Sequence, residues 1–243
     1  FSLNRSKVLV LSEDKDIFGG ELDNTILKDQ LNLMRVGEPM YVFYGYVEDG
    51  YDENGHIVYK NMDDDPAITA ADKTIIGDPN PDFLVNLTTA VSYKGFTLSA
   101  FFQSSIGNDI YSLSMAAQAY DYGYNGNTLR EVYYNHWTPE NPTAKYPNLD
   151  QTSYKMSDRF VYDGSFVRLK NLELAYDVPC ARSKFIKRAR AYVSAQNLFT
   201  ITSYPFWDPD INANGGGSSM IQGVDSYCYP SARTYTIGCR LTF

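Results

Sequence analysis

Hydrophobic and polar residues alternate along several short runs of the chain, most regularly between residues 83 and 103. A period of two is typical of a β-strand with one apolar face. Two such runs flank Lys94-Gly95, and glycine readily takes the positive φ that a two-residue hairpin turn requires. Counting back from this turn pairs Tyr93 with Phe96 and gathers the apolar residues on one face, so the turn and the hydrophobic pattern agree on the register. The segment therefore predicts an antiparallel hairpin.

Further alternating runs cover residues 166–176, 189–196 and 234–243. The first of them changes phase at Lys170-Asn171, which indicates a β-bulge, because one extra residue reverses the alternation of a strand. The last run ends on Phe243, in phase with its apolar positions. Residues 1–40 are less regular, and their topology stays open. Strand-like stretches in and just after this part cover 30–36 and 41–46.

The connections between these runs alternate between short and long. Lys94-Gly95 and the segment after Pro179 are short, whereas residues 104–159 and 201–231 are long and rich in Gly, Asn, Pro and Tyr. In an up-and-down antiparallel sheet, this order places every long loop at one end of the strands, as in outer-membrane barrels. A soluble β-sandwich with inward apolar faces is the alternative. Rings at the turn end of the apolar bands favour the barrel, because they fit an aromatic girdle. We therefore expect an all-β fold: an antiparallel transmembrane β-barrel with long extracellular loops.

Composition narrows the function further. The 243 residues carry a formal net charge of −8, which repels phosphate backbones, so nucleic acid is not an expected partner. Aromatic residues make up 15% of the chain, more than a core of this size needs. No run reaches the roughly 18 consecutive apolar residues of a membrane-spanning helix, a requirement that barrel strands do not share. Three cysteines are too few for a disulfide scaffold, and their state stays open.

No catalytic constellation stands out, and we do not expect an enzyme. The two histidines have no cysteine or carboxylate spacing that would complete a zinc site. One segment does match a known ion-binding pattern, because Asn61 to Asp72 places oxygen ligands at positions 1, 3, 5 and 12 of a twelve-residue loop. The expected calcium ligands are Asn61, Asp63, Asp65, the Ala67 carbonyl and Asp72. Pro66 stands where such loops want a glycine with positive φ, so an acidic solvated turn is the competing interpretation.

The long stretch after residue 104 is dense in rings. Rings with polar tips stack on sugars or clamp peptide side chains at a low cost in rotamer entropy. We therefore expect substrate or partner contacts there, while packing of loop against loop is the alternative. The residues concerned are Tyr120, Tyr122, Tyr124, Tyr133, Tyr134 and Trp137.

Several strings of residues together resemble the C-terminal third of the SusC/RagA family of TonB-dependent outer-membrane transporters. Each string is weak alone, but their order and spacing match as well. They are Gly77-Asp78-Pro79-Asn80-Pro81-Asp82-Phe83, Ser92-Tyr93-Lys94-Gly95-Phe96, Phe101-Phe102-Gln103, Gly107-Asn108-Asp109-Ile110-Tyr111, Asp163-Gly164-Ser165-Phe166-Val167-Arg168-Leu169-Lys170-Asn171, Gln196-Asn197-Leu198-Phe199-Thr200 and Tyr229-Pro230-Ser231-Ala232-Arg233-Thr234-Tyr235.

The resemblance implies that residues 1–243 are the C-terminal segment of a closed barrel of about 22 strands around a plug. It implies import of large nutrients, oligosaccharides or peptides, across the outer membrane of a Gram-negative bacterium. It also implies two partners, a SusD-like surface lipoprotein that acts as a lid, and TonB, which acts through an N-terminal part outside this chain. A non-transporting adhesin or structural barrel and a soluble glycan-binding β-domain stay open as alternative functions.

These interpretations assign strand residues to two faces of the barrel wall, one toward lipid and one toward the lumen. The set expected to contact the lipid bilayer is Val85, Leu87, Val91, Leu98, Phe102, Leu172, Leu174, Ile237 and Leu241. The set expected to face the lumen is Asn86, Thr88, Ser99, Gln103, Ser194, Gln196 and Arg240. Phe243 fits the terminal signal that barrel-assembly machinery recognises. A strand ending in that signal ends on the periplasmic side, so both long loops are expected outside the cell.

Overall fold

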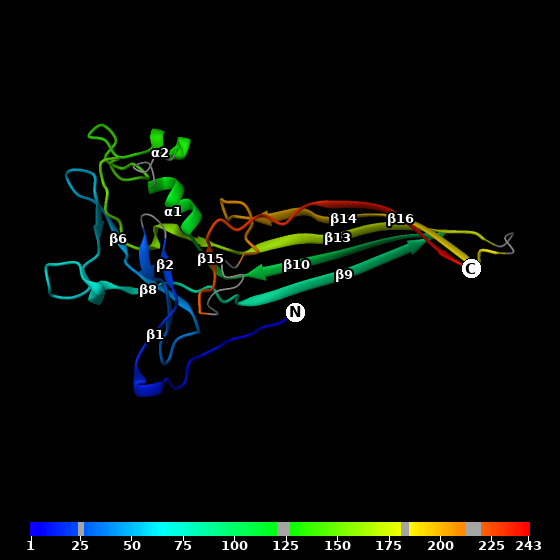
Figure 1. Ribbon diagram of the computed structural model, residues 1–243, viewed down its shortest axis with the longest axis horizontal. Helices are drawn as coiled ribbons and strands as arrows, with labels where there is room; N and C mark the ends of the chain where they lie inside the picture. Colours follow the sequence, from blue (N-terminus) through cyan, green and yellow to red (C-terminus); the bar gives the residue numbers. More distant parts are fainter. Residues whose placement is uncertain (24–26, 121–126, 181–184, 212–219) are drawn as a thin grey trace.

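The longest strands of the chain form one five-stranded antiparallel sheet, here called the long sheet (Figure 1). The computed structural model describes residues 1–23, 27–120, 127–180, 185–211 and 220–243. The order of strands across the long sheet is β16-β14-β13-β10-β9. Their bounds are Phe83–Tyr93 for β9, Phe96–Ile106 for β10, Phe166–Val178 for β13, Arg188–Thr202 for β14 and Thr234–Thr242 for β16.

The hairpin of β9 and β10 has the register that the sequence predicts. Tyr93 pairs with Phe96, and the ladder continues without a shift to Phe83 and Ile106. The turn residues Lys94 and Gly95 both have positive φ, 48° and 87°, which is the geometry of a tight two-residue hairpin turn. The prediction of this hairpin is therefore confirmed, and β10 runs three residues further than the alternation alone indicated.

The predicted bulge also lies where the alternation changes phase. On β10, Phe101 pairs with Asn171 while Phe102 pairs with Leu169, so Lys170 is the extra residue of β13. The ladder between β13 and β14 is shifted at the same place. Because of this shift, Leu169 and Leu172 lie on the same face of the sheet although they are three positions apart.

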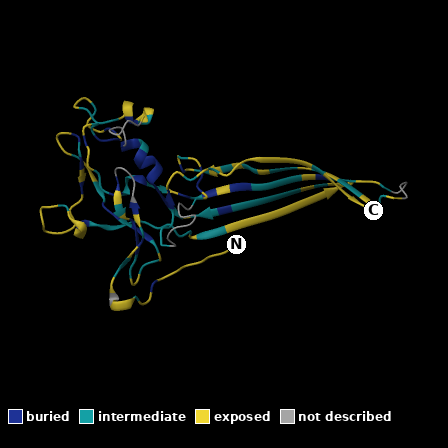
Figure 2. Ribbon diagram, in the orientation of Figure 1, coloured by how far each residue is buried: buried dark blue, intermediate teal, exposed yellow. Residues whose placement is uncertain are grey.

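One face of the long sheet, here called the apolar face, carries the residues that were expected to contact lipid. Cross-strand pairs join them from strand to strand, as in the row Val91, Leu98, Leu174, Val193 and Ile237. Many are exposed, up to 86% for Ile237 (Figure 2). The second sheet that a β-sandwich would stack on this face does not occur among the described residues. The opposite, polar face carries the expected lumen set.

The two ends of the long sheet differ. The β9–β10 turn and Phe243 lie at one end, the turn end, and the connections β10 to β13 and β14 to β16 leave from the other, the loop end (Figure 1). Both long connections therefore lie on one side, as the alternation of loop lengths predicts.

The connections at the loop end, with residues 1–82, build a body of short elements, here called the loop body (Figure 1). Its smaller sheets have the orders β1-β4-β5-β8, β12-β11-β15, β2-β3 and β6-β7. The strands are Ile17–Phe18 (β1), Glu21–Asp23 (β2), Lys28–Gln30 (β3), Asn32–Met34 (β4), Val42–Gly45 (β5), Glu48–Tyr51 (β6), Ile57–Tyr59 (β7), Thr74–Gly77 (β8), Asp109–Ser112 (β11), Val161–Asp163 (β12) and Val224–Asp225 (β15).

The loop body also contains a few short helices, although strands predominate, as the all-β prediction expects. Among the described residues they are α1 (Leu113–Tyr120), α2 (Arg130–Tyr134) and the 3-10 turns Ser12–Asp14, Ala70–Asp72 and Asp158–Phe160. The sequence of α1, LSMAAQAY, is rich in strong helix formers. Within the described ranges, no helix has the length and hydropathy to cross a bilayer.

The hydrophobic core lies in the loop body and not in the long sheet. Phe43, Tyr111, Met156 and Phe160 are at most 2% exposed and belong to one cluster with residues of α1. The ring of Phe43 meets that of Tyr111 edge to face at 6.1 Å between centroids. The loop body therefore supports itself by conventional burial, while the long sheet presents its apolar side chains outward.

Candidate functional site

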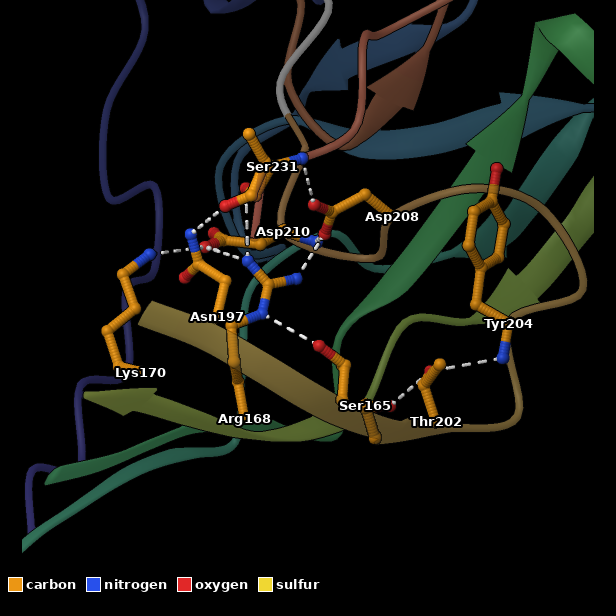
Figure 3. A network of polar contacts seen from close by, with 11 residues as sticks. Ser165, Arg168, Lys170, Asn197, Thr202, Tyr204, Asp208, Asp210 and Ser231 are labelled. Atoms are coloured by element: carbon orange, nitrogen blue, oxygen red, sulfur yellow. Dashed lines mark hydrogen bonds and ion pairs between the residues drawn. The ribbon is translucent and has the colours of Figure 1, made fainter. Parts of the chain in front are cut away.

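A buried arginine joins the polar face of the long sheet to the loop body. Arg168 lies on β13, beside the bulge, and its side chain is 2% exposed. The guanidinium forms an ion pair with Asp208, a residue of the connection between β14 and β16. Its Nε donates to Thr200 Oγ1 at 2.9 Å, and one terminal nitrogen donates to Ser231 Oγ at 3.2 Å. Arg168, Thr200, Asp208 and Ser231 are here called the Arg168 cluster (Figure 3).

The carboxylate of Asp208 is held by backbone groups as well. Its oxygens accept hydrogen bonds from the N–H of Asp210 and of Ser231, both at 2.9 Å. Burial raises the pKa of Asp208, but these two N–H groups and Arg168 together outweigh it, so the pKa lies below its ordinary value. The carboxylate therefore stays ionised and fastens both ends of the loop to β13.

A second buried carboxylate, Asp225 on β15, binds hydroxyl groups. It is 1% exposed, and it accepts hydrogen bonds from Tyr204 Oη at 2.6 Å and from Ser114 Oγ at 3.1 Å. The Ser112 hydroxyl donates in turn to Tyr204 Oη at 2.8 Å. Burial, and after it the hydrogen bond to Asp225, raise the pKa of Tyr204. This cluster ties the connection after β14 to the start of α1.

The structure divides the aromatic residues predicted to bind substrate or a partner. Tyr120 is 4% exposed and stacks on Tyr154 at 3.7 Å between ring centroids, so here it packs loop against loop. Tyr133 and Tyr134, on α2, are 60% and 70% exposed. Trp137 is partly buried and lies against Gly55, where a Cβ would come within 2.3 Å of the indole. Tyr122 and Tyr124 lie outside the described residues.

The predicted calcium loop forms a series of side-chain-to-backbone turns. The side-chain oxygens of Asn61, Asp63 and Asp65 accept hydrogen bonds from the N–H two residues on, at 3.1, 2.8 and 3.0 Å. Asp72 is fully buried and accepts at 2.7 Å from the N–H of Met62 and also from that of Thr69. In the part of the chain that the structure describes, no three His, Cys, Asp or Glu side chains converge as a metal site would require. Calcium binding here stays a prediction.

The Arg168 cluster was missed at the sequence level. Arg168 is separated from Asp208 by 40 residues and from Ser231 by 63, so no local spacing links them. One signal was available, because an arginine between the apolar residues Val167 and Leu169 lies on the polar side of an alternating strand.

Comparisons with known proteins agree with this architecture. TonB-dependent receptor P3 of Formosa agariphila is 32% identical over 264 residues, covering 100% of this chain and 26% of P3. TonB-dependent receptor SusC of Bacteroides thetaiotaomicron is 29% identical over 215 residues, covering 86% of this chain and 20% of SusC. The structure of the RagAB peptide importer in the open-open state matches with a TM-score of 0.76 at 26% identity, over 99% of this chain and 26% of that chain.

The chain thus spans about a quarter of the length of P3 and of the matched RagAB chain. No protein-family model matches the chain. The relatives are receptors and transporters and not enzymes, in agreement with the expectation from sequence. In sequence and in fold, the chain belongs to the SusC/RagA family of TonB-dependent receptors.

Proposed function

We propose that residues 1–243 are the C-terminal part of an outer-membrane transporter that imports large nutrients, peptides or oligosaccharides, with energy delivered through TonB. In this proposal the long sheet is one sector of a closed transmembrane barrel of about 22 strands. The loop end faces the outside of the cell, and the turn end faces the periplasm.

The observation that carries the proposal is the uncovered apolar face. Val91 is 66% exposed, Leu174 44% and Ile237 86%, in one continuous cross-strand row. A soluble protein rarely leaves so extended an apolar surface in water. In a bilayer the same surface is satisfied by lipid tails, while the backbone groups are paired between strands.

The edges of the long sheet also support closure by further strands. Among the described residues, β9 and β16 each pair with one neighbour in the long sheet, so each has an edge that no described strand covers along most of its length. In lipid an unpaired strand edge is strongly unfavourable, and barrels avoid it by closing. Ser2 already forms two hydrogen bonds of 2.9 Å with Leu84 on the free edge of β9.

The loop body is proposed to bind cargo and a SusD-like lid lipoprotein. Among the described rings of the predicted aromatic set, Tyr133 and Tyr134 on α2 are the most exposed, and they lie edge to face at 5.2 Å between centroids. Such rings form binding surfaces with little loss of side-chain entropy. The buried clusters around Arg168 and Asp225 hold the surrounding connections in place, which keeps that surface preorganised.

The proposal is tested with the full-length gene in its native host. We expect the protein in the outer-membrane fraction, and we expect growth on a peptide or glycan mixture to require both this gene and TonB. The matched control restores the deletion with a gene whose TonB-interacting segment is removed. If that control restores uptake, TonB-dependent transport is excluded, and if the full-length protein stays soluble without detergent, the barrel itself is excluded.

A further inference from the structure

A hollow of about 470 Å³ lies on the polar face of the long sheet, near the turn end. Arginines from β14 and β16 dominate its lining. The lining residues are Glu173, Arg188, Arg190, Tyr192, Arg240 and Thr242. It lies at the end of the sheet opposite the loop body and has no part in the proposed outer binding surface.

The charges in this hollow do not balance. Arg190 lies 3.3 Å from Asp177 and 3.5 Å from Glu173, and Arg188 shares Asp177 at 3.4 Å. Arg240 forms no ion pair with any residue that the structure describes. In the ladder between β14 and β16, moreover, Arg190 and Arg240 are direct cross-strand partners. Like charges directly opposite each other destabilise a sheet unless a counter-charge lies near them.

Arg240 is exposed and lines the hollow next to Tyr192. The Tyr192 ring lies over Gly238, because a Cβ at that glycine would be 2.4 Å from the Tyr192 hydroxyl. This ring occupies the polar face of β16 on the loop-end side of Arg240. Arg190 and Arg240 both line the hollow, and two adjacent arginines present donors suited to a carboxylate.

We infer that Arg240, together with Arg190, binds a carboxylate side chain from the part of the same polypeptide that lies outside residues 1–243. The inference rests on the proposed function, since a closed barrel would enclose the polar face. This chain covers 26% of receptor P3, so a polypeptide of that length has most of its residues available as the counterpart. Cargo is a poorer counterpart, because the hollow lies at the end away from the loops.

Photo-crosslinking in the full-length protein tests the assignment. The photoreactive amino acid p-benzoylphenylalanine is placed at position 240, cells are irradiated, and crosslinked peptides are identified by mass spectrometry. We expect an intramolecular crosslink to a segment outside residues 1–243 that contains Asp or Glu. A crosslink to another protein, or the lack of any peptide crosslink, would overturn the inference. The same probe at position 237, on the apolar face, is expected to give no protein crosslink, and a protein crosslink there contradicts the barrel instead.

Charge reversal provides a second measurement. Arg240→Glu is expected to lower the thermal unfolding midpoint of the purified protein. Arg240→Lys, which keeps the positive charge, is expected to lower it less. Replacing the crosslinked acidic residue by arginine should restore the midpoint in the Arg240→Glu background only. If restoration does not occur, the two residues do not form the inferred pair.

Discussion

Arg168 shows how a single charged side chain can hold a long connection. Its guanidinium is almost completely buried, which is tolerated because Asp208, Asp210, Thr200 and Ser231 all accept hydrogen bonds from it. Breaking a buried ion pair by removing one partner typically costs about 3–5 kcal/mol, because the other charge stays buried and unpaired. The effect of a substitution at this residue therefore falls mainly on the loop.

We expect Arg168→Gln to release residues 203–211 from β13, measured as faster amide hydrogen exchange in the full-length protein, by a free energy of roughly 3–5 kcal/mol. The matched control is Lys170→Gln, because Lys170 is partly exposed and lies 3.9 Å from Asp210. An exposed pair of this kind contributes about 0–1 kcal/mol. Equal effects of the two substitutions would contradict the role given to Arg168.

The lowered pKa of Asp208 predicts a dependence on pH. A carboxyl whose folded pKa lies below its unfolded value, about 3.9, stabilises the fold above that value and loses the contribution as the pH falls through the folded pKa. Amide hydrogen exchange of residues 203–211 in the full-length protein, corrected for the intrinsic effect of pH, should therefore report an opening of the loop in acid. In Asp208→Asn this acid-induced opening step should be absent. A step that persists there must come from another group.

The loop Asn61 to Asp72 leads to a prediction about an ion. We expect calcium to bind through oxygens of Asn61, Asp63, Asp65 and Asp72 and the Ala67 carbonyl, at about 2.3–2.6 Å. Because proline cannot take the positive φ of position 6, affinity should be weak, and Pro66→Gly should raise it. Calorimetric titration of the full-length protein checks this, with Asp65→Ala as control. If no heat of binding is measured at millimolar calcium, the segment is an ordinary acidic turn.

At the scale of elements, the long strands could be predicted from sequence and the loop body largely could not. The β9–β10 hairpin and the bulge at Lys170 follow from period-two alternation and turn chemistry, which are local signals. Helix α1 carries no such signal, because seven of its eight residues are buried and its apolar positions do not define one face. It is stabilised by contacts with segments distant in sequence, and those are not visible in a short window.

The two faces of β9 can be tested by one pair of substitutions. Leu87 lies on the apolar face, opposite Phe102, and Thr88 lies on the polar face, opposite Phe101. If the apolar face contacts lipid, Leu87→Arg should cost roughly 2–4 kcal/mol near the middle of the bilayer, and Thr88→Arg much less. Urea unfolding of the full-length protein in lipid vesicles measures both. A larger cost at Thr88 would mean that the faces are assigned the wrong way round.

At the scale of the whole molecule, the turn end and the loop end have separate tasks. Phe243 stands at the turn end, 72% exposed and in phase with Leu241 on the apolar face. Deleting it should reduce the amount of folded protein in the outer membrane without changing its synthesis, because the terminal aromatic is the expected assembly signal. Heat-modifiability on gels and pulse labelling separate the two quantities, with Thr242→Ser as control. Undiminished assembly would remove this role from Phe243.

The loop body has a hydrophobic core of its own, and the described residues of the long sheet contribute little to it. Apart from the contacts of Arg168, mutations that reshape one part are therefore weakly coupled to the stability of the other. In the proposed transporter, insertions and substitutions can accumulate at the loop end and change the cargo that is bound, while the strands keep their apolar face. Divergence among related receptors should accordingly be concentrated in residues 107–165 and 203–233, and swapping these connections as intact units should succeed more often than exchanging single residues within them.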